Sequence, residues 1–226
     1  GLITGDIATS TAGTSNFRAG VNAGDAIVSG ANYNVVVGDE AGTALNNGSL
    51  DNVAVGYQAL VLSNGAAAAN IAIGRHSLGG NLTGVQNVAV GTYALDANTT
   101  ANGNTAVGNS ALSANITGAG NVAVGADAGE FATTANNTTF IGFQAGQGIT
   151  GTKLTGNNNT AVGKDAGLLL QGAAGNNTLV GTSAGAAITT APQNTLIGSQ
   201  AGDGISTGSN NIIIGYEAGS HATNLS

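Results

Sequence analysis

NTAVGNSAL spans Asn104 to Leu112, and NVAVGADAG, from Asn121 to Gly129, repeats its pattern seventeen residues later. A degenerate copy, NFRAGVNAG, runs from Asn16 to Gly24. The glycine of the phrase recurs at Gly38, Gly56, Gly74, Gly91, Gly108, Gly125, Gly142, Gly163, Gly181, Gly198 and Gly215, in steps of 17 or 18 residues apart from one of 21. Nearly the whole chain is therefore one repeat array, and so short a period decides the fold.

The repeat predicts one short strand per coil. Helical repeats need about 33 residues or more and leucine-rich repeats about 20 or more, whereas strands joined by turns can close a coil in fewer. Within N-x-A-V-G the β-branched residues alternate with alanine, which is the period of a strand, and the glycine permits a turn. We therefore expect an all-β fold, a parallel β-solenoid (β-roll) of 17–18-residue coils. Residues 1–30 would be a degenerate capping repeat and residues 31–226 the array, truncated at its C-terminus.

The composition excludes several classes of protein. The 226 residues include 39 glycines, four Phe and four Tyr, with no Trp, Met or Cys. Four Lys and Arg against eleven Asp and Glu leave no basic stripe for phosphates, so we expect no nucleic-acid partner. No apolar run reaches the roughly 18 residues of a membrane span, so we expect no membrane insertion. Disulfides and thiolate metal sites are ruled out without cysteine.

Both faces of the predicted strand are apolar. We expect the Val, Ile or Thr residues on either side of the central position to form the core of each coil. The central position would then point outward. An exposed apolar stripe is unfavourable in water, so we expect sister chains around a shared axis to bury it. A lone solenoid whose stripe lies under its own segments is the alternative. The predicted trimer-interface residues are Val36, Ala54, Ala72, Ala89, Ala106, Ala123, Phe140, Ala161, Leu179, Leu196 and Ile213.

An asparagine stands four residues before the glycine in ten of the eleven repeats, and Thr138 is the exception. A polar row of this kind could bind sugar or ice, but asparagines at a solenoid bend usually hydrogen-bond their own backbone and the asparagine of the next coil. Thr105, Thr139, Thr160, Thr178 and Thr195 share their position with Val and Ile, which makes them a poor ice template. The predicted structural ladder is Asn34, Asn52, Asn70, Asn87, Asn104, Asn121, Asn159, Asn177, Asn194 and Asn211.

The two residues after the glycine vary freely and are predicted to face solvent, so they form the recognition lane. Recognition by the shaft itself would fall in this lane or in the long repeat with its GITGTKLTGNNN loop. Decoration that keeps the chain soluble is the alternative. The lane includes Asp39-Glu40, Tyr57-Gln58, Arg75-His76, Thr92-Tyr93, Phe143-Gln144, Lys164-Asp165 and Tyr216-Glu217.

Enzymatic chemistry finds little support in the sequence. His76 and His221 lie on different repeats, no carboxylate pair recurs at motif spacing, and no serine has a glycine elbow. The glycine-rich phrases precede no amphipathic helix, which a dinucleotide loop requires. We therefore predict that the chain is not an enzyme and has no catalytic residue, cofactor or metal site.

NVAVGYQAL, NTAVGNSAL and NTLIGSQAG resemble the repeats of phage and marine-virus tail fibres. N-x-A-V-G-x-x-A is also similar to the S-V-A-I-G-x-x-S repeat of trimeric autotransporter adhesin heads. The resemblance covers residues 16–219 and implies a left-handed β-roll, three chains wide. The longer period, and Asn and Ala where the adhesin motif has Ser, favour the viral-fibre relatives.

The resemblance implies a structural and adhesive role. We expect a shaft or head segment of a homotrimeric viral tail fibre, located in the virion, that serves host-surface attachment. Its partners would be two sister chains, other fibre or virion proteins and a host-surface glycan or protein. The alternative is a bacterial trimeric adhesin head at the cell surface that binds matrix or glycans. An ice-binding or glycan-degrading solenoid would require a flat threonine face or a cleft with paired carboxylates.

Overall fold

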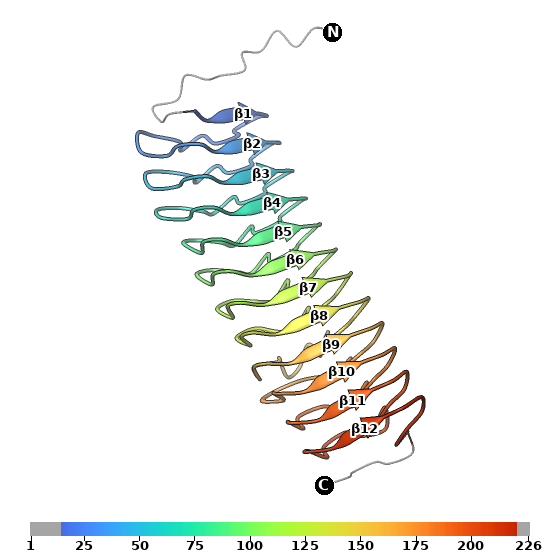
Figure 1. Ribbon diagram of the computed structural model, residues 1–226. Helices are drawn as coiled ribbons and strands as arrows, with labels where there is room; N and C mark the ends of the chain where they lie inside the picture. The colour runs from blue at the N-terminus through green and yellow to red at the C-terminus, as the bar shows by residue number, and fades with distance from the viewer. Residues whose placement is uncertain (1–14, 221–226) are drawn as a thin grey trace, which may run out of the picture.

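Twelve three-residue strands stack in chain order into one parallel sheet, and every strand belongs to a separate coil of a solenoid (Figure 1). The computed structural model describes residues 15–220, and these contain no helix. The predicted parallel β-solenoid is confirmed. The strands are β1 (Phe17–Ala19), β2 (Val35–Val37), β3 (Val53–Val55), β4 (Ile71–Ile73), β5 (Val88–Val90), β6 (Thr105–Val107), β7 (Val122–Val124), β8 (Thr139–Ile141), β9 (Thr160–Val162), β10 (Thr178–Val180), β11 (Thr195–Ile197) and β12 (Ile212–Ile214).

The strands pair in the register of the sequence repeat. Ala106 of β6 lies opposite Ala89 of β5 and Ala123 of β7, so equivalent residues form straight rows along the rod. The parallel hydrogen bonding continues past each strand, since the amide of Gly108 donates to the carbonyl of Val90 at 2.8 Å. Backbone hydrogen bonds therefore join each coil to its neighbours.

The repeated glycine is required by the close stacking of the coils. Gly56 has φ +128°, and a Cβ at this position would lie 2.7 Å from the carbonyl oxygen of Gly74 in the next coil. A side chain would thus strain the backbone and strike the neighbouring coil at once. The same glycine-on-glycine contact recurs along the rod, which explains why this position never varies.

The central residue of each strand points into the coil, so the predicted orientation of the strands is wrong. The predicted interface residues lie beneath the chain's own segments, as the monomeric alternative described, and together with turn residues they form one apolar cluster. In many coils the central residue is alanine, because a second buried residue, four positions after the glycine, fills the rest of the interior. Val36, Ala54, Ala72, Ala89, Ala106, Ala123, Phe140, Ala161, Leu179 and Leu196 are fully buried within one chain, and Ile213 is partly buried against the same cluster.

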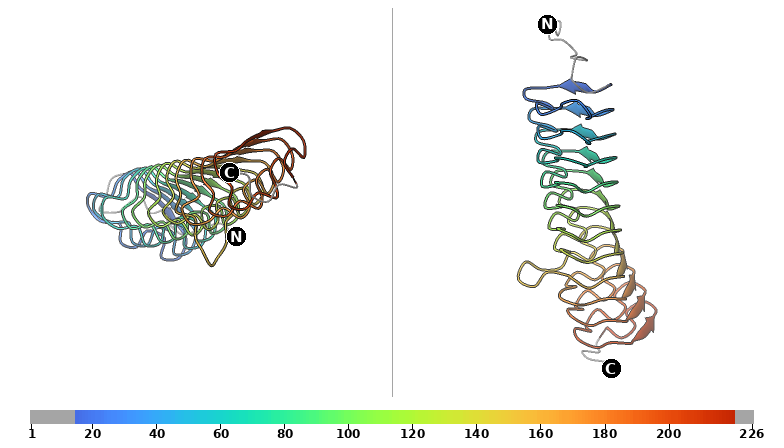
Figure 2. Two further views of the ribbon diagram at one scale, coloured as in Figure 1. Left: turned by 90° about the horizontal axis from the view of Figure 1, so that it is seen from below. Right: turned by 90° about the vertical axis from the view of Figure 1, so that its left-hand side faces the viewer.

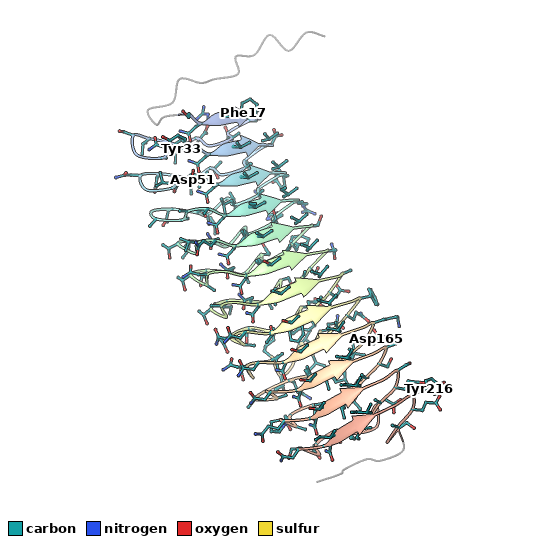
Figure 3. All side chains as sticks on the ribbon, in the orientation of Figure 1. Phe17, Tyr33, Asp51, Asp165 and Tyr216 are labelled. Atoms are coloured by element: carbon teal, nitrogen blue, oxygen red, sulfur yellow. The ribbon has the colours of Figure 1, made fainter. Side chains whose placement is uncertain are left out.

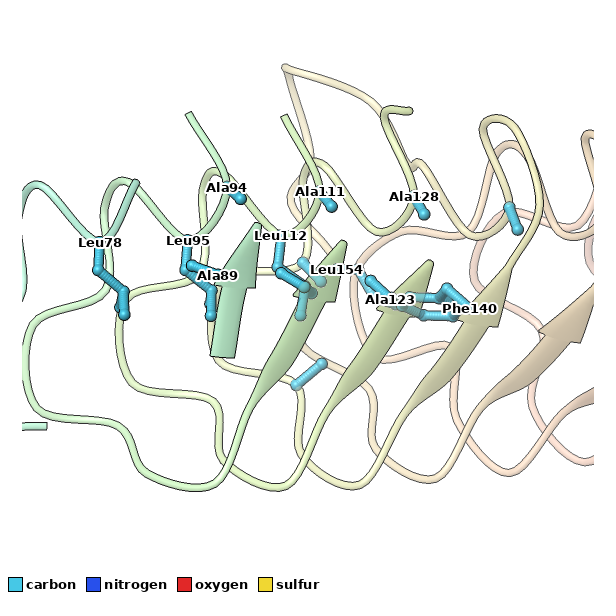
Figure 4. Packing of buried hydrophobic residues seen from close by; sticks show 14 of the residues in the cluster. Leu78, Ala89, Ala94, Leu95, Ala111, Leu112, Ala123, Ala128, Phe140 and Leu154 are labelled. Atoms are coloured by element: carbon cyan, nitrogen blue, oxygen red, sulfur yellow. The ribbon is translucent and has the colours of Figure 1, made fainter. Parts of the chain in front are cut away.

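Two positions share the space inside each coil. Where the central strand residue is alanine, as at Ala106, the residue four after the glycine is often a buried leucine such as Leu112. Leu78, Leu95 and Leu112 repeat along the interior in this way (Figure 4). Where the central residue is larger, that position is glycine: a Cβ at Gly202 would lie 2.9 Å from Cδ1 of Leu196. The interior volume is thus conserved by exchange between the two positions.

The 21-residue repeat between β8 and β9 carries an extra loop. Residues 148–153 project from the side of the rod, while Leu154 returns to the buried interior (Figure 2). At the base of the loop, Lys153 Nζ lies 4.2 Å from the centroid of the Phe131 ring. The insertion therefore changes the outline of the rod at one coil without interrupting the sheet.

The N-terminal coil departs from the pattern in its interior. Arg18 occupies the central position of β1, opposite Val36, and its Nη1 donates to the carbonyl of Gly24 at 2.8 Å. A charged side chain thus stands where later coils carry an apolar one. Of the predicted capping segment 1–30, residues 1–14 lie outside the described part, as do residues 221–226 at the predicted truncated end.

Candidate functional site

The outward face of the sheet is an uncharged, largely apolar strip along the rod, with threonine at the first position of five strands. It consists of the first and third residues of every strand, which the sequence analysis placed in the core. Ile73 and Ile141 are each 40% exposed, and the strip contains no charged residue. At about 4.8 Å per strand it is roughly 50 Å long. Its rows are Phe17, Val35, Val53, Ile71, Val88, Thr105, Val122, Thr139, Thr160, Thr178, Thr195 and Ile212, and Ala19, Val37, Val55, Ile73, Val90, Val107, Val124, Ile141, Val162, Val180, Ile197 and Ile214.

The asparagines before the strands form a buried hydrogen-bonded ladder. In each run the backbone amide of one asparagine donates to the side-chain oxygen of the asparagine in the preceding coil, as Asn121 does to Asn104 at 2.9 Å. The side-chain amide of Asn104 donates to the carbonyl of Gly118 at 2.9 Å, which ties the strand to the next bend. These amides are buried and occupied with the chain's own backbone, so they offer no surface to a ligand.

The ladder has one gap. Thr138 donates its backbone amide and its hydroxyl to Asn121 Oδ1, at 2.9 and 2.8 Å. A second run begins at Asn159 and continues through Asn177 and Asn194 to Asn211. The change of residue coincides with the repeat that carries the extra loop.

A second ladder, not predicted from the sequence, lies in the bend that follows the strands. Asn98 donates its side-chain amide to Asn81 Oδ1 at 2.9 Å, and Asn115 donates to Asn98 Oδ1 at 3.1 Å. Ser63 accepts from Asn81 at one end. At the other end the next coil carries Ala132, and the buried Asn115 Oδ1 has no hydrogen-bond donor. The signal in the sequence was asparagine seven residues after the glycine in three successive repeats.

The recognition lane runs along the edge of the sheet that follows the strands. In Figure 3, Asp165 and Tyr216 lie at this edge, whereas Tyr33 and Asp51 lie before their strands at the opposite edge. Lys164 and Asp165 form a salt bridge within the lane. In its N-terminal part the ring of His76 stacks on Tyr93 at 5.4 Å and 16°, and meets Tyr57 edge-on at 5.8 Å. The lane therefore brings aromatic and charged side chains together on neighbouring coils.

Few titratable groups have a perturbed environment. Partial burial raises the pKa of Asp96 above 3.8, and the charge of His76 opposes that rise. No group of three His, Asp or Glu side chains within residues 15–220 is arranged to hold a metal ion. His221 lies outside the described residues. No helix in the described range has the length and hydrophobicity needed to cross a membrane.

Comparison of the chain with protein-family models, with curated proteins and with solved structures gives no match.

Proposed function

We propose that the chain is a shaft segment of a homotrimeric viral tail fibre that serves host-surface attachment. The rod would hold a receptor-binding region away from the particle, and three copies would raise avidity for a repeated surface target. The observation that carries the proposal is the outward apolar strip of the sheet. Contiguous apolar surface of this extent usually marks an interaction site.

The repeat of the strip favours sister chains as its cover. Its side chains recur at every strand over the full rod, so a partner must match both its spacing and its length. A second copy of the chain has the same period because it has the same sequence. The strip carries no charge that would oppose contact between copies. Val107 and Val124 of neighbouring strands, rather than Ala106 and Ala123, are therefore the proposed contact residues.

The resemblance to adhesin heads supplies the number of chains and the handedness. We take from it a threefold arrangement and a left-handed coil. In a trimer each strip meets two others around the axis, so all the apolar rows are covered. The proposed partners are accordingly two sister chains, the fibre or virion proteins at the ends of the shaft, and a host-surface molecule.

The assembly is tested by the mass of the protein in solution and by a charge placed on the strip. Analytical ultracentrifugation of the wild type should give three times the chain mass of 21.5 kDa. Val107→Lys should shift the protein toward single chains with an unchanged far-UV spectrum, because a lysine on the strip would be buried without a partner. Asn109→Lys is the matched control, since Asn109 is exposed two residues further along, in the recognition lane.

A wild type that sediments as a folded single chain at micromolar concentration contradicts the trimer. Equal dissociation of Val107→Lys and Asn109→Lys contradicts the choice of surface. The viral assignment is tested on the parent chain: a particle-attachment region and a C-terminal folding domain support it, whereas a coiled-coil stalk and a membrane anchor contradict it.

A bacterial surface adhesin head is the second candidate function. The aromatic cluster of Tyr57, His76 and Tyr93 favours it, because a head must contact its ligand directly. Both functions use the same trimer, so the parent chain separates them and the mass does not.

A further inference from the structure

Four side chains of the recognition lane form a patch on three successive coils, from β3 to β5. Tyr57 and Arg75 are exposed, whereas His76 and Tyr93 beside them are half-buried. The rings of Tyr57, His76 and Tyr93 are in contact from coil to coil. Half of the tyrosines of the chain and one of its four basic residues thus gather at one place on the rod.

The backbone holds this patch rigidly. The amide of His76 donates to the carbonyl of Tyr57 at 3.0 Å, and that of Tyr93 donates to Arg75 at 2.9 Å. These bonds extend the parallel ladder of the sheet into the lane. The backbone positions of the four residues are therefore fixed before a ligand binds, which favours affinity.

Arg75 is the charged group of the patch and is free to bind. Its guanidinium carbon lies 5.3 Å from the centroid of the Tyr93 ring, a distance at which cation and ring attract each other. Within residues 15–220 the Arg75 side chain makes no hydrogen bond and no salt bridge. The carboxylates of the lane two coils earlier are occupied elsewhere: Asp39 accepts from the amide of Val21, and Glu40 accepts from Gln58.

We propose that this patch binds a carboxylate-bearing saccharide, such as a sialic or uronic acid unit of a surface glycan. The planar guanidinium matches a carboxylate through two parallel hydrogen bonds, which a point charge cannot reproduce. The exposed ring of Tyr57 in the preceding coil supplies apolar contact and a hydroxyl for the sugar. In a chain of net charge −7, this local cation also gives an acidic ligand a defined place to bind.

The size of the patch favours a sugar unit over a protein. Three strand positions cover roughly 10 Å along the rod. A stable protein interface buries about 800 Å² on each partner, well beyond the extent of these four side chains. A weak single site is useful only when repeated, so the inference rests on the attachment role proposed above. The patch itself lies on one chain and needs no neighbour to be complete.

The probe is sialyllactose displayed on a polymer, compared with lactose on the same polymer and with a sulfated lactose. Biolayer interferometry should show binding of the sialylated polymer, and Arg75→Gln should weaken that binding by on the order of tenfold or more. Arg75→Lys should recover only part of it, because the bidentate geometry is lost. Lys164→Gln is the matched control, since Lys164 is an exposed cation of the same lane on a distant coil. Its affinity should stay within about twofold of the wild type.

Equal binding of sialyllactose and lactose, a preference for the sulfated probe, or an unaffected Arg75→Gln variant would each overturn the inference. Failure of the sialylated polymer and of a polyuronate to bind at all would do the same. The sedimentation mass is measured on the same samples. A trimer without acidic-glycan binding contradicts this site alone, and a single chain that binds contradicts the trimeric shaft alone.

Discussion

Phe140 fills space that glycines leave open in its own and the preceding coil. A Cβ added at Gly129 would lie 2.6 Å from Cδ2 of the Phe140 ring, and the ring lies against Gly146 as well. Ala123 and Ala161 flank Phe140 in the rows above and below. One large side chain thus replaces the alanine and leucine pair that fills the coils from β3 to β6.

Combining Phe140→Ala with Gly146→Leu should restore the packing that either substitution alone disrupts in this coil. Phe140→Ala alone should cost about 3–5 kcal/mol through the cavity it leaves. Gly146→Leu alone should also destabilise, because it overpacks the ring. The double variant recreates the Ala106 and Leu112 pair, and Leu112 has φ +50° close to the +58° of Gly146. A urea double-mutant cycle should show coupling on the order of 2 kcal/mol, and additive losses would contradict shared volume.

Asn104→Ala should be among the most damaging polar substitutions in the rod. It removes the acceptor of the buried Asn121 amide and the donor to the Gly118 carbonyl. Each buried group left unpaired costs about 1–3 kcal/mol. We expect a total loss of roughly 3–5 kcal/mol in urea unfolding. Asn109→Ala, at an exposed position of the same repeat, should change stability by at most about 0.5 kcal/mol. Equal effects of both variants would show that the ladder contributes nothing.

Ala132→Ser should stabilise the rod. The new hydroxyl stands one coil beyond Asn115, whose buried side-chain oxygen lacks a donor. A hydrogen bond to that oxygen should contribute about 1 kcal/mol. Ala123→Ser, which places a hydroxyl among apolar side chains, should instead destabilise by about 1–3 kcal/mol. Thermal unfolding of both variants measures the contrast, and a lower Tm for Ala132→Ser would contradict it.

Asp96→Asn should stabilise the protein at neutral pH and have little effect in acid. Burial raises the pKa of Asp96 in the folded state, so folding favours the protonated carboxyl. Its contribution is present below the unfolded pKa near 3.8 and is lost as pH rises through the higher folded pKa. Urea midpoints at pH 3.5 and pH 7 should therefore differ less for the variant. Asp51→Asn, on the exposed side of another coil, is the control, and a pH-independent gain for Asp96→Asn would exclude this cause.

The period of the sequence predicted where every strand lies but not which way it faces. The strands occupy the three positions before the repeated glycine, including β1 in the degenerate copy. The alternation of side chains along a strand defines two faces but does not show which of them is buried. The β-branched side chains on both sides of Ala106 suggested a core of Val and Ile. The interior space is instead shared between the central strand residue and the residue four positions after the glycine. The signal lay in size exchange: leucine follows alanine at Leu60 and Leu112, and glycine follows the larger residues at Gly42 and Gly202.

The functional residues were less accessible to sequence reasoning for the same reason. Because the strands face the opposite way to the prediction, the outward strip consists of the first and third strand residues, many of them valine and isoleucine, and not of the central alanines and leucines. The recognition lane was identified from its variability. The contacts among Tyr57, His76 and Tyr93 depend on the stacking of coils about 18 residues apart, which only three-dimensional register makes visible.

The repeat around β8 combines a missing asparagine rung, a neighbouring amide oxygen without a donor and an inserted loop. In a solenoid each coil is stabilised only by the coils beside it, so a local deficit is not shared with the rest of the rod. The protein should therefore behave mechanically as two stiff segments joined by one weaker coil. Under axial load in an optical trap we expect two separate rips, with the first break between Thr138 and Asn159, and a single rip would show that the joint transmits force as well as any other coil.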